Sequence, residues 1–216
     1  MSRRGNTECG RLADATLTGR AIVDWQMASS RAYTRRVRTA EPMTADELFA
    51  LDLPNKQVEL VRGRLFVREP PGARHGEVAM RIAFEIMKHV EAHALGRVFA
   101  AETGFHLFSK PDTVRAPDVA FVRRDRIQGP VPVKYLAMSP DLAVEVLSPD
   151  DRPGRVLAKV GDWLEGGSAI VWVVDPVRCT ARVHRADGSV SLLQSDAVLF
   201  GDGVLPGFEL PLTSVL

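Results

Sequence analysis

Leu142-Ala143-Val144-Glu145-Val146-Leu147 is the stretch that decides the fold of this 216-residue chain. Its apolar residues form an almost unbroken run, which is typical of a strand buried on both faces of a sheet. Glu145 interrupts the run, and a lone carboxylate there costs on the order of several kcal/mol unless another group compensates its charge. Folding gains nothing from this carboxylate, so we expect Glu145 to serve a functional site.

The neighbouring sequence predicts alternating helices and strands. A helix is expected over 152–165, with Leu157 on its buried face, and Ala169–Val174 is a second apolar strand. A short helix with a Thr44–Glu47 capping box and a β-hairpin over 58–67 come first. Further elements are a long amphipathic helix over 75–94 and strands at 97–108, 114–122, 181–185 and 190–193. This order predicts an α/β sandwich around a mixed sheet.

Composition excludes several classes of protein. Hydrophobic residues make up 45% and charged residues 25%, which is ordinary for a globular domain. No apolar run reaches the roughly 18 residues of a membrane span, and no signal-peptide core is visible. The two cysteines, Cys9 and Cys179, lie far apart and have no metal-like spacing. We therefore expect a protein without membrane association in a reducing cytoplasm.

Charge is uneven along the chain and divides it into two parts. Residues 1–40 contain eight arginines and three acids and lack a sustained apolar period, so they are expected to form a disordered or loosely attached basic arm. The arm is either a nucleic-acid-binding tail or a dispensable extension, with Met43 a plausible start. Residues 41–216 are expected to form the folded domain, which has a slight excess of acids.

Two other residues are candidates to act with Glu145. Asp118 opens the apolar strand Asp118-Val119-Ala120-Phe121-Val122, and two acids directed at one point by neighbouring strands usually hold a hard cation. When the residues of the 152–165 helix are placed around its axis at 100° per residue, Lys159 falls beside the buried face. Each residue also has a plainer interpretation: Asp118 as a solvated loop acid, Glu145 as the buried partner of Arg115, and Lys159 as an ordinary snorkelling lysine.

Together the three residues suit phosphodiester hydrolysis. Two carboxylates bind Mg²⁺, or Mn²⁺ in its place, and leave coordination positions for water and phosphate. The metal lowers the pKa of its water, and an ammonium beside it orients the nucleophile and stabilises the developing charge.

Asp118, Glu145 and Lys159 resemble the active site of the PD-(D/E)XK nuclease superfamily. Residues 43–216 are similar, in order and spacing, to the Uma-type restriction endonuclease family common in bacteria. The matching stretches are Met43–Glu47, Glu59–Gly63, Pro117–Val119, Glu145–Pro149 and Val171–Pro176. The resemblance implies a restriction-endonuclease-like core with Asp118 and Glu145 as metal ligands. The superfamily lysine falls at Leu147 here, so the resemblance assigns that role to Lys159 on the following helix.

Further candidates carry weaker signals. The superfamily often has an upstream acid that assists the metal, which points to Glu59, although a solvent-facing hairpin residue would have the same pattern. His75 begins the long helix and is expected to contact phosphate or a metal-bound water, unless it is a surface residue. His89 and His93 have zinc-like i, i+4 spacing without a third ligand. The loop arginines Arg123, Arg124 and Arg126 are candidates to grip a phosphate backbone.

These observations give two functional hypotheses. The first is an Mg²⁺-dependent endonuclease that hydrolyses DNA, with a homodimer favoured because symmetric dimers readily cut both strands. The second is a catalytically inactive binding or assembly module with the nuclease fold, in which Lys159 only neutralises the two acids.

Overall fold

The computed structural model describes residues 41–127 and 129–216. The basic arm predicted over residues 1–40 lies outside the described residues. The helices are α1 (Ala45–Phe49), α2 (Ala73–Ala92), α3 (Pro153–Glu165) and a short 3-10 helix, η1 (Leu212–Ser214). The strands are β1 (Gln57–Val61), β2 (Arg64–Arg68), β3 (Gly96–Ala100), β4 (Phe105–Phe108), β5 (Thr113–Arg115), β6 (Val119–Arg123), β7 (Leu142–Val146), β8 (Ile170–Asp175), β9 (Thr180–Arg185), β10 (Val190–Leu193), β11 (Val198–Phe200) and β12 (Glu209–Pro211).

The centre of the fold is a six-stranded mixed sheet in the order β10-β9-β8-β7-β6-β3. β7 and β8 are parallel and are joined through α3, while the other pairs in the sheet are antiparallel. All five residues of β7 and all six of β8 are buried. The apolar run around Glu145 is therefore an interior strand, and the predicted α/β architecture with its flanking helices and N-terminal hairpin is confirmed.

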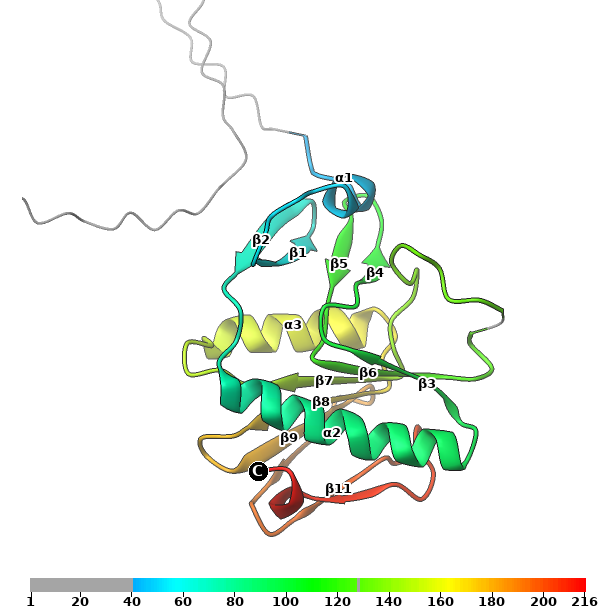
Figure 1. Cartoon of the computed structure of the whole chain (residues 1–216), viewed down its shortest axis with the longest axis vertical. Helices are drawn as coiled ribbons and strands as arrows, with labels where there is room; N and C mark the ends of the chain where they lie inside the picture. Colours follow the sequence, from blue (N-terminus) through cyan, green and yellow to red (C-terminus); the bar gives the residue numbers. More distant parts are fainter. Residues whose placement is uncertain (1–40, 128) are drawn as a thin grey trace, which may run out of the picture. The chain divides into compact units, whose positions relative to one another are not determined.

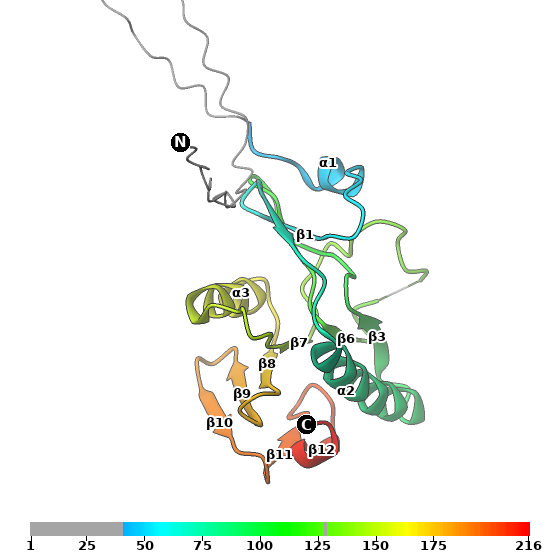
Figure 2. The same cartoon turned by 60° about the vertical axis from the view of Figure 1, so that its left-hand side comes forward.

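Helices cover both faces of this sheet (Figures 1 and 2). On one face, α2 packs through Val78, Ile82 and Ile86 onto apolar strand residues and the C-terminal segment. On the other face, α3 packs through Val160 and Trp163 onto residues such as Ala143. None of the helices within the described residues has the length and apolar character needed to cross a bilayer.

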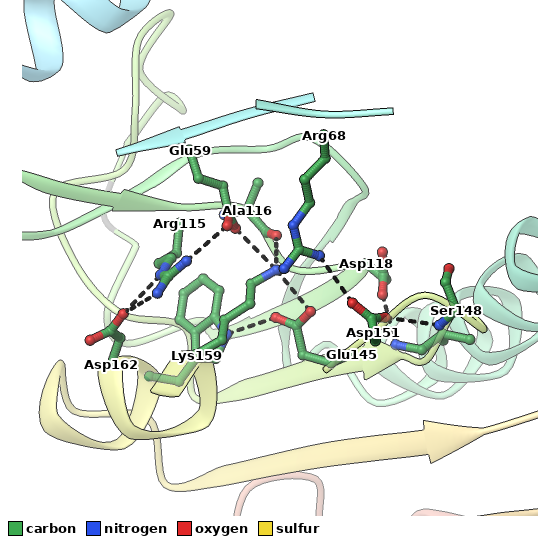
Figure 3. Close-up of polar contacts among 12 residues, drawn as sticks. Glu59, Arg68, Arg115, Ala116, Asp118, Glu145, Ser148, Asp151, Lys159 and Asp162 are labelled. Atoms are coloured by element: carbon green, nitrogen blue, oxygen red, sulfur yellow. Dashed lines mark hydrogen bonds and ion pairs between the residues drawn. The ribbon is translucent and has the colours of Figure 1, made fainter. Parts of the chain in front are cut away.

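The N-terminal hairpin belongs to a second sheet. β1 and β2 join at Arg62-Gly63, where both residues have positive φ, as a tight two-residue hairpin turn requires. The hairpin then pairs through β1 with β5, and β5 pairs with β4, giving the order β2-β1-β5-β4. One face of this sheet packs on α1 through Leu48 and Leu60. The other face brings Glu59 toward α3 (Figure 3).

Two stretches that the sequence predicts as single strands are each divided in the structure. The stretch 97–108 is divided at a turn around Glu102, whose φ is positive, so that β3 and β4 lie in different sheets. The stretch 114–122 is divided after Arg115, and Pro117 in the interruption has no N–H for a strand ladder. The chain thus passes from the hairpin sheet to the central sheet immediately before Asp118.

Smaller corrections concern surface and terminal residues. Leu157, predicted to be buried, is 58% exposed on the outer side of α3. The C-terminal pair β11–β12 has no counterpart among the predicted elements; it forms its own two-stranded sheet, and Leu199 and Leu210 within it are buried in the same core as α2.

Candidate active site

Neighbouring strands place Asp118 and Glu145 side by side. Asp118 immediately precedes β6, whose ladder with β7 begins at the pair Val119 and Val144, and the Asp118 amide donates to the Val144 carbonyl at 3.0 Å. The two carboxylates lie close enough for the charge of Asp118 to raise the pKa of Glu145. The Val146 amide donates to Asp118 Oδ2 at 2.7 Å and fixes that carboxylate at the end of the strand.

Helix α3 brings Lys159 onto the same face of the sheet. Pro153 occupies the first turn of the helix, and Val160 and Trp163 pack against β7 and β8. Lys159, beside this apolar face, is buried, and its Nζ donates to Glu145 Oε2 at 2.8 Å and to the Ala116 carbonyl at 2.8 Å. Because this amine is buried and bonded, Lys159 is not a snorkelling surface lysine.

The hairpin sheet closes the cluster from above (Figure 3). Glu59 on β1 is buried, and its Oε1 lies 3.0 Å from Lys159 Nζ. Arg115 donates to Glu59 Oε2 at 2.9 Å and, through Nε and Nη2, to Asp162 Oδ2 at 2.8 and 2.5 Å. Glu59 is therefore held between two cations, which rules out a solvent-facing hairpin position.

Burial and mutual charge set the protonation of this cluster. Burial raises the pKa of Glu145 to about 7; Lys159 opposes this rise, while the Asp118 and Glu59 carboxylates add to it. Burial also disfavours the charged form of Glu59, but Lys159, Arg115 and the Ala116 amide outweigh it and lower its pKa to about 2. The carboxylates likewise overcome desolvation at Lys159 and raise its pKa, so the ammonium stays charged.

His75 reaches the site from α2 on the other face of the sheet. Its Nε2 lies 3.2 Å from Asp118 Oδ2, and its buried Nδ1 has no hydrogen-bond partner among the described residues. Burial lowers the pKa of His75, but its contact with Asp118 and the charges of Asp118 and Asp151 outweigh this and raise it. His75 is therefore not a surface residue, and its contact is a carboxylate.

The structure also gives the partners of Arg115 and of the two candidate zinc ligands, His89 and His93. Arg115 does not pair with Glu145; it pairs with Glu59 and Asp162. Each zinc candidate contacts a backbone carbonyl, His89 that of Pro206 and His93 that of His89. Neither histidine is therefore directed at a shared metal position.

Two of the three loop arginines are engaged by protein acids. Arg123 pairs with Asp125 and Arg126 with Asp141. A phosphate would compete with those acids at both positions, which makes this loop a poorer anion site than its sequence indicates.

Sequence reasoning missed two residues that hold the charged groups in place. Trp163 Nε1 donates to Glu145 Oε1 at 2.8 Å, and Asp162 anchors Arg115. Trp163 has the sequence signal of a core residue, which it also is. Asp162, on the same helix, carries no pattern that distinguishes it from a solvated acid.

The donor set fits one hard cation only in part. Glu145 Oε1 and Oε2 each accept from the protein, and Asp118 meets its partners through Oδ2, which leaves Asp118 Oδ1 without a partner in the described chain. Across residues 41–127 and 129–216, no group of three or more His, Cys, Asp or Glu side chains is placed to hold a metal ion. Mg²⁺ typically uses one or two carboxylates and keeps several waters, so Asp118 Oδ1 together with a Glu145 oxygen released by Lys159 or Trp163 would be sufficient to hold it.

Comparison with known proteins agrees with this fold. The chain is similar to a solved structure titled as a putative nuclease of DUF820 from Anabaena variabilis, with 22% identity, a TM-score of 0.69, and coverage of 81% of this chain and 97% of that one. No curated protein matches the chain. A family model described as "Putative restriction endonuclease", Uma2, matches residues 45–213. That match covers the second sheet, the central sheet and every candidate site residue, and the chain belongs to the Uma2 family.

Proposed function

We propose that the protein is an Mg²⁺-dependent endonuclease that hydrolyses phosphodiester bonds in DNA. The observation that carries the proposal is the buried cluster itself: the Asp118 carboxylate lies near that of Glu145, and the Lys159 ammonium is bound to Glu145. A buried charged cluster seldom improves stability over apolar packing, so its presence favours a chemical role. Membership of a family described as "Putative restriction endonuclease" supports the same conclusion.

Asp118 and Glu145 are the residues that would hold the metal. A bound Mg²⁺ would lower the pKa of a water ligand and neutralise charge on the phosphate. Glu145, whose pKa is raised to about 7, takes up a metal only as the carboxylate, so the Lys159 ammonium beside it favours the competent form. His75 holds Asp118 from the other face, which restricts the orientation of the carboxylate.

Lys159 and Glu59 supply the remaining roles. Lys159 contacts Glu145 directly, and it orients the attacking water when one of its three oxygen partners gives way to that water. The uncharged Ala116 carbonyl is the weakest of those partners. Glu59, bound by Lys159 and Arg115 with a pKa of about 2, stays ionised and assists by holding Lys159 rather than by binding the metal.

Cleavage of a supercoiled plasmid across an Mg²⁺ and Mn²⁺ titration tests the proposal. We expect nicking or linearisation with either metal, none with EDTA, and loss of activity in Glu145→Ala and Asp118→Asn. Glu209→Gln, which alters an exposed carboxylate on β12, is the matched control and is expected to cut normally. Equal cutting by Glu145→Ala and the wild type, or no cutting by the wild type, would refute it.

One observation favours a second function, that of a non-catalytic binding or assembly module. Both Glu145 oxygens are already satisfied by Lys159 and Trp163, as a purely structural ion cluster requires. Thermal melting separates the two functions. A working metal site predicts that Mg²⁺ or Mn²⁺ raises the Tm of the wild type and not that of Glu145→Gln. A structural cluster predicts that Glu145→Gln changes stability equally with and without metal.

A further inference from the structure

The face of β2 that looks toward the candidate active site carries two arginines and an aromatic residue. Side chains alternate along a strand, so Arg64, Phe66 and Arg68 share one face. In the β1–β2 register Phe66 lies opposite Glu59, whose side chain reaches Lys159. Figure 3 shows Glu59 and Arg68 both extending from the hairpin into the region of the acids.

Arg68 is held loosely compared with Arg115. Its one ion pair with the described residues is a 3.5 Å contact with Asp151 Oδ1, and its side chain is 39% exposed. Arg115 is buried and bonded to both Glu59 and Asp162. A guanidinium has five N–H donors, so Arg68 keeps most of its donors available to a ligand.

Lys159 cannot serve an incoming phosphate as readily. An ammonium has three N–H donors, and three protein oxygens, from Glu145, Ala116 and Glu59, already lie within 3.0 Å of its nitrogen. A polyanion approaching Asp118 and Glu145 also meets like charge. A phosphate bound near these carboxylates therefore needs a further cation, and Arg68, which extends from the hairpin toward the acids in Figure 3, is in position to provide it.

Arg64 and Phe66, the other two residues on this face of β2, are also exposed. Arg64 is exposed and makes no ion pair within the described part of the chain. Phe66 is 40% exposed, whereas the opposite face of the hairpin packs on α1. Arg64 and Arg68 are four residues apart, about 13 Å along a strand. Guanidinium groups suit phosphates, and an exposed ring between them suits a sugar or base.

We propose that Arg64, Phe66 and Arg68 form the surface on which DNA lies as it enters the site. Arg68 leaves Asp151 and binds a phosphate beside the acid pair, Arg64 binds a second phosphate along the same strand, and Phe66 packs between them. The inference rests on the proposed function, because it assigns a DNA-binding face to that same site.

Fluorescence anisotropy with a labelled 20-base-pair duplex in EDTA, over a range of salt concentrations, tests the surface without cleavage. Arg68→Gln is expected to weaken binding about tenfold and to reduce the salt slope by about one, with a smaller loss for Arg64→Gln. Phe66→Leu is expected to weaken binding without changing that slope. Arg182→Gln, at an exposed position of β9, is the matched basic control and should bind as the wild type does.

A variant with the opposite effect guards against misfolding as an explanation. Asp151→Asn removes the acid that competes for Arg68, while its amide oxygen can still accept from the Ser148 amide. It is expected to tighten duplex binding about two- to threefold, a gain that a damaged fold would not give. Unchanged binding in both Arg68→Gln and Asp151→Asn overturns the surface.

Plasmid cleavage then separates this inference from the proposed function. If the wild type cuts and Arg68→Gln cuts with the same KM, the surface is wrong and the nuclease stands. If the wild type binds the duplex through Arg68 without cutting, the surface stands and hydrolysis falls. If the wild type neither binds nor cuts, both are wrong.

Discussion

The two faces of the six-stranded sheet bury different kinds of groups. The face under α2 is an apolar core, with Ile82, Ile86 and Trp172 fully buried. The face under α3 is also apolar around Val160, but it contains the ion cluster of Glu145, Lys159 and Glu59. The same strands contribute to both faces, so the sheet itself does not require these charges. Apolar packing is sufficient for stability on the α2 side, so we infer that the charges on the α3 side serve the proposed chemistry.

The largest effect is predicted for removal of the buried cation from the face under α3. Lys159→Met leaves Glu145 and Glu59 buried without their shared cation, and removing one partner of a buried ion pair costs about 3–5 kcal/mol. We expect that loss in the free energy of unfolding from urea denaturation at pH 7. Ile86→Ala, on the α2 face, is the control. Its cavity costs about 2–5 kcal/mol at every pH, whereas the Lys159→Met deficit should shrink on acidification. A deficit independent of pH would contradict the charged origin.

The second prediction concerns pH. Glu145 has a folded-state pKa of about 7, above its ordinary value of 4.5, so its contribution is fully favourable below pH 4.5 and is lost as pH rises through 7. In EDTA, wild-type stability relative to Glu145→Gln should fall by about 3 kcal/mol between about pH 4.5 and about pH 8. Glu59, with its pKa lowered to about 2, acts in the opposite sense and loses its contribution only below pH 4.5. Parallel pH profiles for wild type and Glu145→Gln would show that Glu145 titrates normally.

The third prediction uses the two buried tryptophans, one on each face. Trp163 donates to Glu145, whereas Trp172 Nε1, on the α2 face, has no partner among the described residues. Replacement by Phe removes similar volume at both sites but takes a hydrogen bond from a charged group only at Trp163. Trp163→Phe should therefore cost about 1.5–3 kcal/mol more than Trp172→Phe in chemical denaturation. Equal costs would mean that the bond to Glu145 contributes nothing to stability.

The smallest effect is expected outside both buried faces. Phe84 lies on the outer side of α2 and is 57% exposed, so Phe84→Ser removes little buried area. Its free energy of unfolding should stay within about 0.5 kcal/mol of the wild type. A loss of several kcal/mol that depends on protein concentration would instead reveal that a second copy of the chain covers this helix, as a homodimer through this face would require.

Sequence predicts the elements whose signals are local. The apolar runs of β7 and β8 and the 3.6-residue period of α2 depend on neighbouring residues only, so the structure contains all three where the sequence predicts them. The stretches 97–108 and 114–122 each look like one strand, because hydrophobicity alone does not show that the chain moves to another sheet at Glu102 and Pro117. The position predicted for Leu157 is wrong because the buried stripe of α3 is narrower than its sequence indicates.

The candidate site also contains some residues that the sequence identifies and others that only the structure identifies. Glu145 is singled out by sequence because a charge inside an apolar strand is unusual wherever that strand lies. Glu59 and His75 are ambiguous in the sequence, since each has an ordinary surface interpretation that only burial in the structure removes. Arg68 and Asp162 give no signal, because their contacts with Asp151 and Arg115 are made only in the folded chain.

By itself the sequence determined that an interior strand carries a carboxylate, that an acid opens the neighbouring strand, and that a lysine borders the apolar face of the following helix. Only the tertiary structure decided which cation pairs with which acid: Lys159 rather than Arg115 with Glu145, both cations with Glu59, and Arg115 with Asp162. Burial cost depends on local hydrophobicity and can be read along the chain. Compensation depends on distances between residues far apart in sequence, and folding alone sets those distances.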